Sequence, residues 1–87
     1  MRKSTFSPEY GVLRRELVAI RLSAGLSQRA LATRLSVPPS WVSKVETGER
    51  RLDLVELSWF CKGCGKSPST VAKAILGAME KGAKDNE

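Results

Sequence analysis

The chain has 87 residues, which is enough for one small domain with a single apolar core. It carries 15 basic and 9 acidic residues and no histidine; the net charge of +6 favours a polyanion such as DNA as partner, although a merely soluble basic surface has the same composition. No apolar run approaches the ~20 residues of a membrane span and the N-terminus has no apolar signal region, so we expect a cytoplasmic protein with no membrane partner.

The N-terminal part is predicted to contain a flexible basic arm and then a helix. Residues 1–6 are the arm, and the folded domain is expected to span residues 7–81. Ser7 and Pro8 are typical of a helix start, as cap and first helical residue, and Gly25 is a suitable terminator. The apolar stripe of this helix consists of Leu13, Leu17 and Ile20.

The segment from Ser27 to Gly48 is predicted to form two short helices joined by a sharp turn. Ser27 can cap the first helix, in which Leu31 and Leu35 are four residues apart and therefore share a face. Pro38 disfavours a helical conformation in the residue before it, so the first helix must end by then.

Pro39 suits the first position of the second short helix, where its missing N–H is not needed. Val42 and Val45 lie on one side of this helix and are expected to face inward. The outward side is expected to carry Ser40, Ser43 and Lys44, with Trp41 at its flank. Two short helices, the second presenting polar and basic residues, are typical of a helix-turn-helix.

Two more helices are predicted after Gly48. Asp53 is the expected cap of the fourth helix, which Gly63 or Gly65 ends, and Ser67 with Pro68 begins the fifth. The inner side of the fourth helix is assigned to Leu54, Val55, Leu57, Ser58 and Phe60. Residues 82–87 are expected to form a flexible polar tail. The predicted fold class is therefore all-α, with five helices in one domain.

Cys61 and Cys64 form a Cys-Lys-Gly-Cys motif at the end of an apolar helix. A zinc site needs about four ligands, and the chain has no histidine and no further cysteine. Structural thiols are therefore favoured over redox chemistry, and a zinc ion shared between two chains remains the alternative. We expect no cofactor, no small-molecule ligand and no enzymatic activity.

A longer pattern extends over most of the chain. Its residues are Arg21, Gly25-Leu26-Ser27-Gln28, Leu31-Ala32, Val37, Ser40, Val42-Ser43-Lys44, Glu46, Gly48, Arg50, Leu52-Asp53 and Glu56-Leu57. With it, residues 10 to 77 resemble the DNA-binding domain of the phage lambda repressor and Cro group, the Xre-type regulators. The resemblance implies a compact five-helix lambda-repressor-like domain in a bacterial or phage-infected cytoplasm.

The resemblance also implies a DNA-binding surface. Relatives bind a phosphate at the position of Gln28, where the start of a helix already favours an anion. Two roles remain open for Trp41: it contacts a thymine methyl or a sugar, or it covers the groove between helices. The implied DNA-binding residues are Gln28, Arg29, Pro39, Ser40, Trp41, Ser43, Lys44, Thr47, Arg50 and Arg51. Arg21 and Glu46 match a pair that forms an internal salt bridge in relatives.

Two departures from the family pattern concern the turn and the third helix. Ser36 stands where glycine is usual, and its left-handed conformation would cost roughly 1 kcal/mol. Pro38 and Pro39 cannot donate to a base, so base contacts are expected to shift to Ser40 and Lys44.

The sequence thus predicts a transcriptional regulator, a repressor, that binds a two-fold operator in double-stranded DNA as a homodimer with its third helix in the major groove. The expected dimer interface comprises Val71, Ile75, Leu76 and Met79 in the fifth helix, although core packing would also account for this stripe. The alternatives are a DNA-binding antitoxin of a toxin–antitoxin pair and a protein-interaction adaptor on the same fold.

Overall fold

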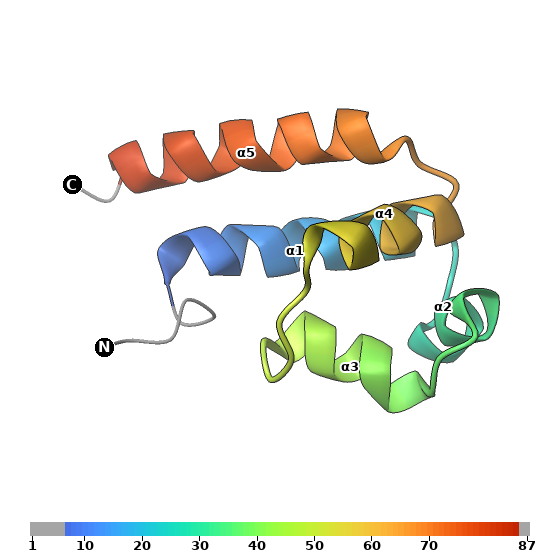
Figure 1. The fold of residues 1–87 in the computed structure, drawn as a ribbon. Coiled ribbons are helices and arrows are strands. Elements are labelled where there is room, and N and C mark those ends of the chain that lie inside the picture. Colours follow the sequence, from blue (N-terminus) through green and yellow to red (C-terminus); the bar gives the residue numbers. More distant parts are fainter. Residues whose placement is uncertain (1–6, 86–87) are drawn as a thin grey trace.

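The computed structural model describes residues 7–85, and side chains up to Gly82. The described part contains five α-helices and no strand (Figure 1). The helices are α1 (Pro8–Ser23), α2 (Gln28–Leu35), α3 (Pro39–Thr47), α4 (Leu54–Gly63) and α5 (Pro68–Asp85). The all-α fold and the order of the five helices agree with the sequence prediction.

The predicted ends of the domain can be compared only in part. Because α5 continues through Asp85, the boundary predicted at residue 82 lies inside this helix. The predicted basic arm, residues 1–6, and residues 86–87 of the predicted tail lie outside the described residues. None of the described helices has the length and apolar character needed to cross a membrane.

Short polar side chains begin α1, α2 and α4 at the predicted positions. The Ser7 hydroxyl accepts the Tyr10 amide at 3.1 Å, and the Ser27 hydroxyl accepts the Ala30 amide at 3.0 Å. Asp53 accepts the Glu56 amide at 2.8 Å while Glu56 Oε1 accepts the Asp53 amide at 3.0 Å, a complete capping box. These local bonds satisfy amides that have no partner inside the helix.

The turn between α2 and α3 depends on Ser36. This residue is left-handed, with φ 57° and ψ 43°, as predicted for the position where relatives have glycine. The Val37 amide donates to Ala32 O at 3.0 Å and the Ser36 amide to Thr33 O at 3.2 Å. This pair of bonds is a Schellman motif, which closes α2 and turns the chain sharply into α3.

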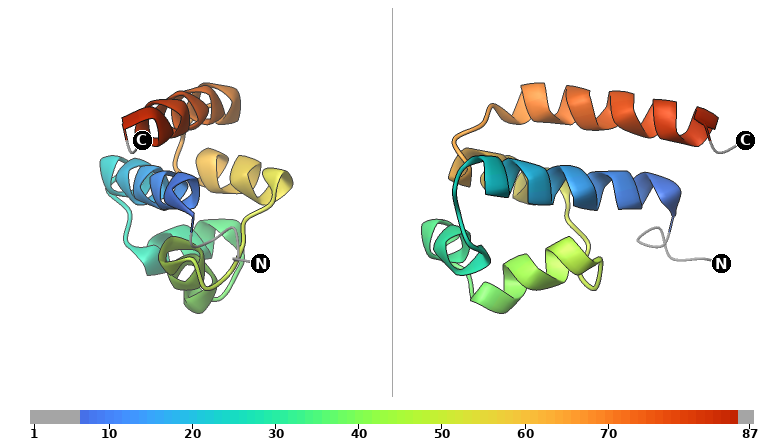
Figure 2. Two further views of the ribbon diagram at one scale, coloured as in Figure 1. Left: turned by 90° about the vertical axis from the view of Figure 1, so that its left-hand side faces the viewer. Right: turned by 180° about the vertical axis from the view of Figure 1, so that it is seen from behind.

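The helices form three layers, with α1 and α4 in the middle, α5 on one side and the α2–α3 pair on the other (Figures 1 and 2). The main core lies where α1, α2, α3 and α4 meet, and a second cluster lies under α5. The main core is built around Leu17, Leu31, Val42, Val45 and Phe60. The second cluster comprises Cys61, Val71 and Ile75. α3 is therefore held by its apolar side, with its other side free.

The outer face of α4 differs from the sequence prediction. Leu54 is 78% exposed and Val55 is 59% exposed, so assigning both to the inner side was wrong. Phe60 is fully buried, and Leu57 packs against the core three residues earlier. Leu54 is the first helical residue, at the edge of the core, while Val55 and Trp59 are four residues apart on the solvent side.

Both thiols lie in the interior, as the structural interpretation of the Cys-Lys-Gly-Cys motif predicted. Cys61 and Cys64 are free and buried, and burial raises the pKa of each thiol. A raised pKa lowers the fraction of reactive thiolate at neutral pH. No group of three or more metal-ligating side chains occurs among residues 7–82.

Candidate nucleic-acid interface

The outward side of α3 is the candidate DNA-contacting surface. Ser40, Lys44 and Thr47 are all exposed, and their spacing of four and three residues places them in one stripe along the helix. Val42 and Val45 on the opposite side are buried. Because the buried valines hold the helix in place, the exposed stripe is presented on a rigid support.

The start of α3 has few backbone donors. Pro38 is the cap and Pro39 the first helical residue, and neither has an N–H. The Trp41 amide already donates to Pro38 O at 2.9 Å. Ser40 is therefore the residue at this end best able to donate to DNA, through its amide and hydroxyl, and the exposed Pro39 offers only an apolar contact.

Ser43, Trp41 and Thr47 differ in how available they are. Ser43 and Trp41 are half-buried, and Trp41 packs against the main core, so part of its ring covers the interior. The Thr47 hydroxyl lies 3.2 Å from Lys44 O and 3.3 Å from Glu49 Oε1. Both neighbours are acceptors, so the single hydroxyl proton is used within the protein. Lys44 is the one charged residue of α3 that is exposed.

The start of α2 lies beside a buried ion pair. Arg21 and Glu46 form the salt bridge expected from the sequence: Arg21 Nε donates to Glu46 Oε2 at 2.6 Å and Arg21 Nη2 to Oε1 at 3.0 Å. Arg21 Nη1 also donates to Leu26 O at 2.8 Å. The hydrogen bonds that Arg21 donates to the Glu46 carboxylate raise the pKa of Arg21. The pair joins α1 to the end of α3 and to the loop before α2.

Gln28, the first residue of α2, is connected to this ion pair. Its Nε2 donates to Glu46 Oε1 at 2.9 Å, so one amide N–H points into the protein. The other N–H and the carbonyl oxygen are not used by this bond. Arg29 beside it is exposed, and the first amides of α2 have no partner inside the helix. This helix end can therefore hold an anion such as a phosphate.

Arg50 has a structural task that the sequence analysis did not foresee. Its Nη2 donates to Glu56 Oε2 at 2.7 Å and its Nη1 to Glu56 Oε1 at 3.1 Å and Arg51 O at 2.8 Å. Its guanidinium carbon lies 5.1 Å from the centroid of the Trp41 ring. These bonds tie Arg50 to α4, while its side chain remains 39% exposed, so its expected contact with DNA stays a prediction. The neighbouring Arg51 is the more exposed basic residue of this loop.

The Arg50–Glu56 pair predicts a pH dependence. The hydrogen bonds from Arg50, and then from the Asp53 amide, hold the pKa of Glu56 below its ordinary value of 4.5. Folding therefore favours the ionised carboxylate; this contribution is complete above pH 4.5 and is lost as the pH falls through the folded-state pKa. We expect Glu56→Gln to lower the free energy of unfolding by about 1 kcal/mol at pH 6, with the difference shrinking towards pH 3.

The measurement is urea denaturation of the parent and Glu56→Gln at several pH values. Glu80→Gln, at an exposed carboxylate of α5, is the matched control and should show no such trend. A difference between parent and Glu56→Gln that stays constant from pH 6 to pH 3 would contradict the assignment.

The residues predicted for a dimer interface separate into two groups. Val71 and Ile75 are buried against α1 and α4, so the structure corrects their assignment: both belong to the core of the chain itself. Met79 is half-buried and packs against the same cluster. Leu76 is exposed and remains available for contact with a partner.

Sequence reasoning missed one contact that supports the loop before α4. The Tyr10 hydroxyl accepts the Leu52 amide at 2.9 Å, which connects the start of α1 to the end of the α3–α4 loop. The two residues are 42 positions apart, and no local pattern signals their contact. The capping role of Glu56 was also missed, although the sequence does indicate it: Asp53 and Glu56 have the spacing of a capping box.

Two short helices crossing at a tight left-handed turn, the second one exposed, define a helix-turn-helix domain. A family described as "Helix-turn-helix domain" matches residues 12–74 of the sequence. The structure is also similar to an XRE-family like protein from Pseudomonas syringae pv. tomato str. DC3000, with 40% sequence identity and a TM-score of 0.77. This match covers 80% of this chain and 85% of that chain.

Two structures of the clp gene regulator ClgR from Corynebacterium glutamicum are similar as well. One has 26% identity and a TM-score of 0.76, covering 90% of this chain and 83% of that chain. The other has 27% identity and a TM-score of 0.71, covering 82% and 92%. Comparison with curated protein sequences gives no match. The chain belongs to the XRE-type helix-turn-helix family of DNA-binding transcriptional regulators.

Proposed function

We propose that this protein recognises a specific operator in double-stranded DNA by placing α3 in the major groove, and that it represses transcription there. The observation that carries the proposal is the exposed stripe of Ser40, Lys44 and Thr47 on a helix whose other side is buried. A domain that occupies an operator needs no further surface to block a promoter, which favours repression over activation.

Within this proposal the side chains divide into those that contact bases and those that contact phosphates. Lys44 can donate to guanine O6 or N7, and Ser40 can donate to or accept from several base edges. The proposed contacts to backbone phosphates are the start of α2, with Gln28 and Arg29, and the exposed Arg51. Phosphate contacts orient the domain but do not distinguish sequences.

Binding as a homodimer is part of the proposal. One small domain makes a limited interface with DNA, and two copies on a two-fold site double the base contacts. Leu76 supports α5 as the contact between copies, because it is a large apolar side chain that the chain itself leaves exposed. The proposed setting is the cytoplasm.

The experiment begins with selection of bound duplexes from a random DNA pool and continues with titrations at several salt concentrations. A good base contact contributes about 1 to 3 kcal/mol of discrimination. We therefore expect Lys44→Ala to narrow the affinity gap between the selected duplex and a scrambled one. Arg51→Ala should weaken both duplexes about equally and reduce the salt slope by about 1.

Arg51→Ala is the matched control, since it also removes one exposed positive charge near the same surface. A parallel loss of both affinities in Lys44→Ala would make Lys44 a phosphate contact and would leave Ser40 or DNA shape to provide specificity. Failure to enrich any sequence from the pool would overturn the proposal of a specific operator.

A further inference from the structure

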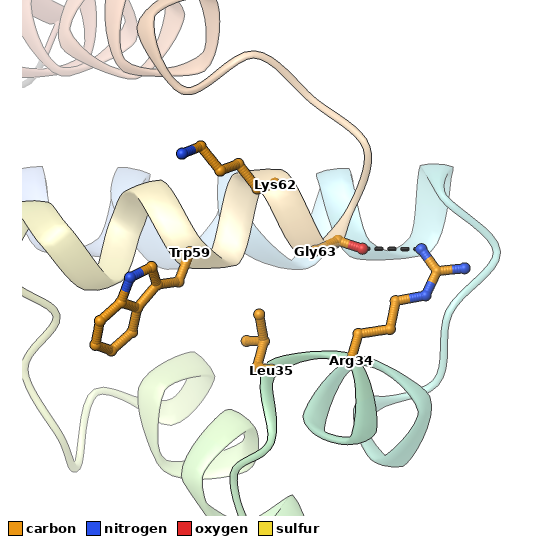
Figure 3. Close-up of a pocket in the computed structure, with 5 residues that line it drawn as sticks. All are labelled: Arg34, Leu35, Trp59, Lys62 and Gly63. Carbon is orange, nitrogen blue, oxygen red and sulfur yellow. Dashed lines mark hydrogen bonds between the residues drawn. The ribbon is translucent and has the colours of Figure 1, made fainter.

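An open groove lies between α2 and α4 (Figure 3). It has a volume of about 520 Å³. Its lining residues are Arg34, Leu35, Trp59, Lys62 and Gly63, none of which belongs to α3. The DNA contacts proposed above include none of these side chains.

The two walls of the groove are held together. Arg34 Nη1 donates to Gly63 O at 2.9 Å, which ties the last turn of α2 to the end of α4. Gly63 also permits close approach: a Cβ there would lie 2.8 Å from Leu31 Cδ1 and 2.9 Å from Leu35 Cδ2. The groove is therefore preformed, and a ligand would not have to order it.

The apolar side of the groove presents large apolar side chains to solvent. Trp59, which forms one wall of the groove (Figure 3), is 51% exposed. Val55, also exposed, precedes it by four residues in α4 and therefore lies on the same side of that helix. Tryptophan is enriched among the residues that dominate protein–protein binding, because its large ring buries much area and has few rotatable bonds. Such a wall suits an apolar side chain better than a phosphate backbone.

The charge of the groove is of one sign. Lys62 is exposed beside Trp59, Arg34 lies across from it, and no acidic residue lines the groove. Arg34 uses one nitrogen for Gly63 O and keeps its other donors. The charge therefore complements a carboxylate adjacent to whatever apolar group contacts Trp59.

We propose that the α2–α4 groove is a docking site for a protein partner, specifically a segment that carries an aromatic or branched apolar side chain next to Asp or Glu. The apolar side chain rests on Trp59 and Leu35, and the carboxylate pairs with Lys62 and Arg34. Because α3 is not part of the groove, the partner can bind while α3 faces DNA.

The test is selection of peptides from a random phage-displayed library on the full chain, followed by titration of a synthetic selected peptide. We expect enriched peptides to combine an apolar side chain with neighbouring acidic residues. Trp59→Ser and Lys62→Glu should each lower the peptide affinity by about tenfold or more. Leu22→Ser, at an exposed leucine of α1 outside the groove, is the matched control and should stay within about twofold.

Several outcomes would overturn the proposal. It would be overturned if no peptide were enriched, or if the enriched peptides lacked acidic residues. It would also be overturned if Trp59→Ser bound the selected peptide as tightly as the parent. An equal loss of affinity of Trp59→Ser for non-specific duplex DNA would assign the groove to DNA. Dissociation of a self-assembled form of the chain by Trp59→Ser, seen by sedimentation, would assign it to a second copy. Circular dichroism checks folding, and Lys62→Glu decides alone if Trp59→Ser unfolds.

Discussion

Glu46→Ala is expected to lower the free energy of unfolding by about 3 to 5 kcal/mol, because it leaves the charge of Arg21 buried without a counter-ion. In the parent the carboxylate accepts two bonds from Arg21 and one from Gln28. After the substitution, Leu26 O is the acceptor that remains for Arg21 among these bonds. Since small domains have about 5 to 15 kcal/mol of stability in total, the loss should be visible as a large fall in the urea midpoint.

The control for this prediction is the double variant Arg21→Met with Glu46→Leu. It removes both charges together and fills similar volumes with apolar atoms, so most of the lost stability should return. Urea denaturation followed by circular dichroism measures all three proteins. A loss below about 1 kcal/mol in Glu46→Ala would mean that Arg21 becomes solvated when its partner is removed, as surface pairs do.

The same ion pair connects the interior to the proposed DNA-binding surface. Glu46 lies on the buried side of α3, and through Oε1 it holds the Gln28 side chain at the start of α2. The position of Gln28 therefore depends on the relative placement of α1, α2 and α3. Through this dependence, the buried Glu46 is expected to influence the phosphate contact proposed for Gln28.

The parts of the fold that local chemistry determines were predicted from the sequence. The caps Ser7, Ser27 and Asp53 lie where they were expected, because a side chain bonded to an amide three residues later needs no tertiary information. The left-handed Ser36 was expected from the family resemblance, in which glycine is usual at that position. The Arg21–Glu46 pair was expected only from the family resemblance, since the two residues are 25 positions apart.

The errors concern residues whose surroundings come from distant segments. The bonds from Arg50 to Glu56 and the position of its guanidinium over the Trp41 ring were not foreseen, while its contact with DNA stays a prediction. Leu54 and Val55 were assigned to the core because they are apolar, although nothing in the sequence tells which side of α4 the other helices cover. The groove lined by Trp59 was missed for the same reason: its walls belong to two helices.

The fifth helix offers the sharpest contrast between neighbours. Ile75 is 3% exposed and packs against the cluster under α5, whereas the adjacent Leu76 is 57% exposed. Ile75→Glu is expected to lower the free energy of unfolding by about 4 kcal/mol or more, enough to unfold much of the protein. It removes a buried apolar side chain, and it also forces a carboxylate into a site with no basic partner in that cluster.

Leu76→Glu is the matched variant, with the same new charge one residue away. It should change the stability of the single chain by about 0.5 kcal/mol or less, because the side chain already faces solvent. Its expected effect is on association: if α5 joins two copies, sedimentation should show a shift from dimer towards monomer, and operator affinity should fall while the fold persists. Thermal melts by circular dichroism and sedimentation at matched concentrations separate the effect on folding from the effect on association.

A folded Ile75→Glu would contradict the placement of Ile75 in the core. An unchanged dimer in Leu76→Glu would exclude the exposed side of α5 as the contact between copies.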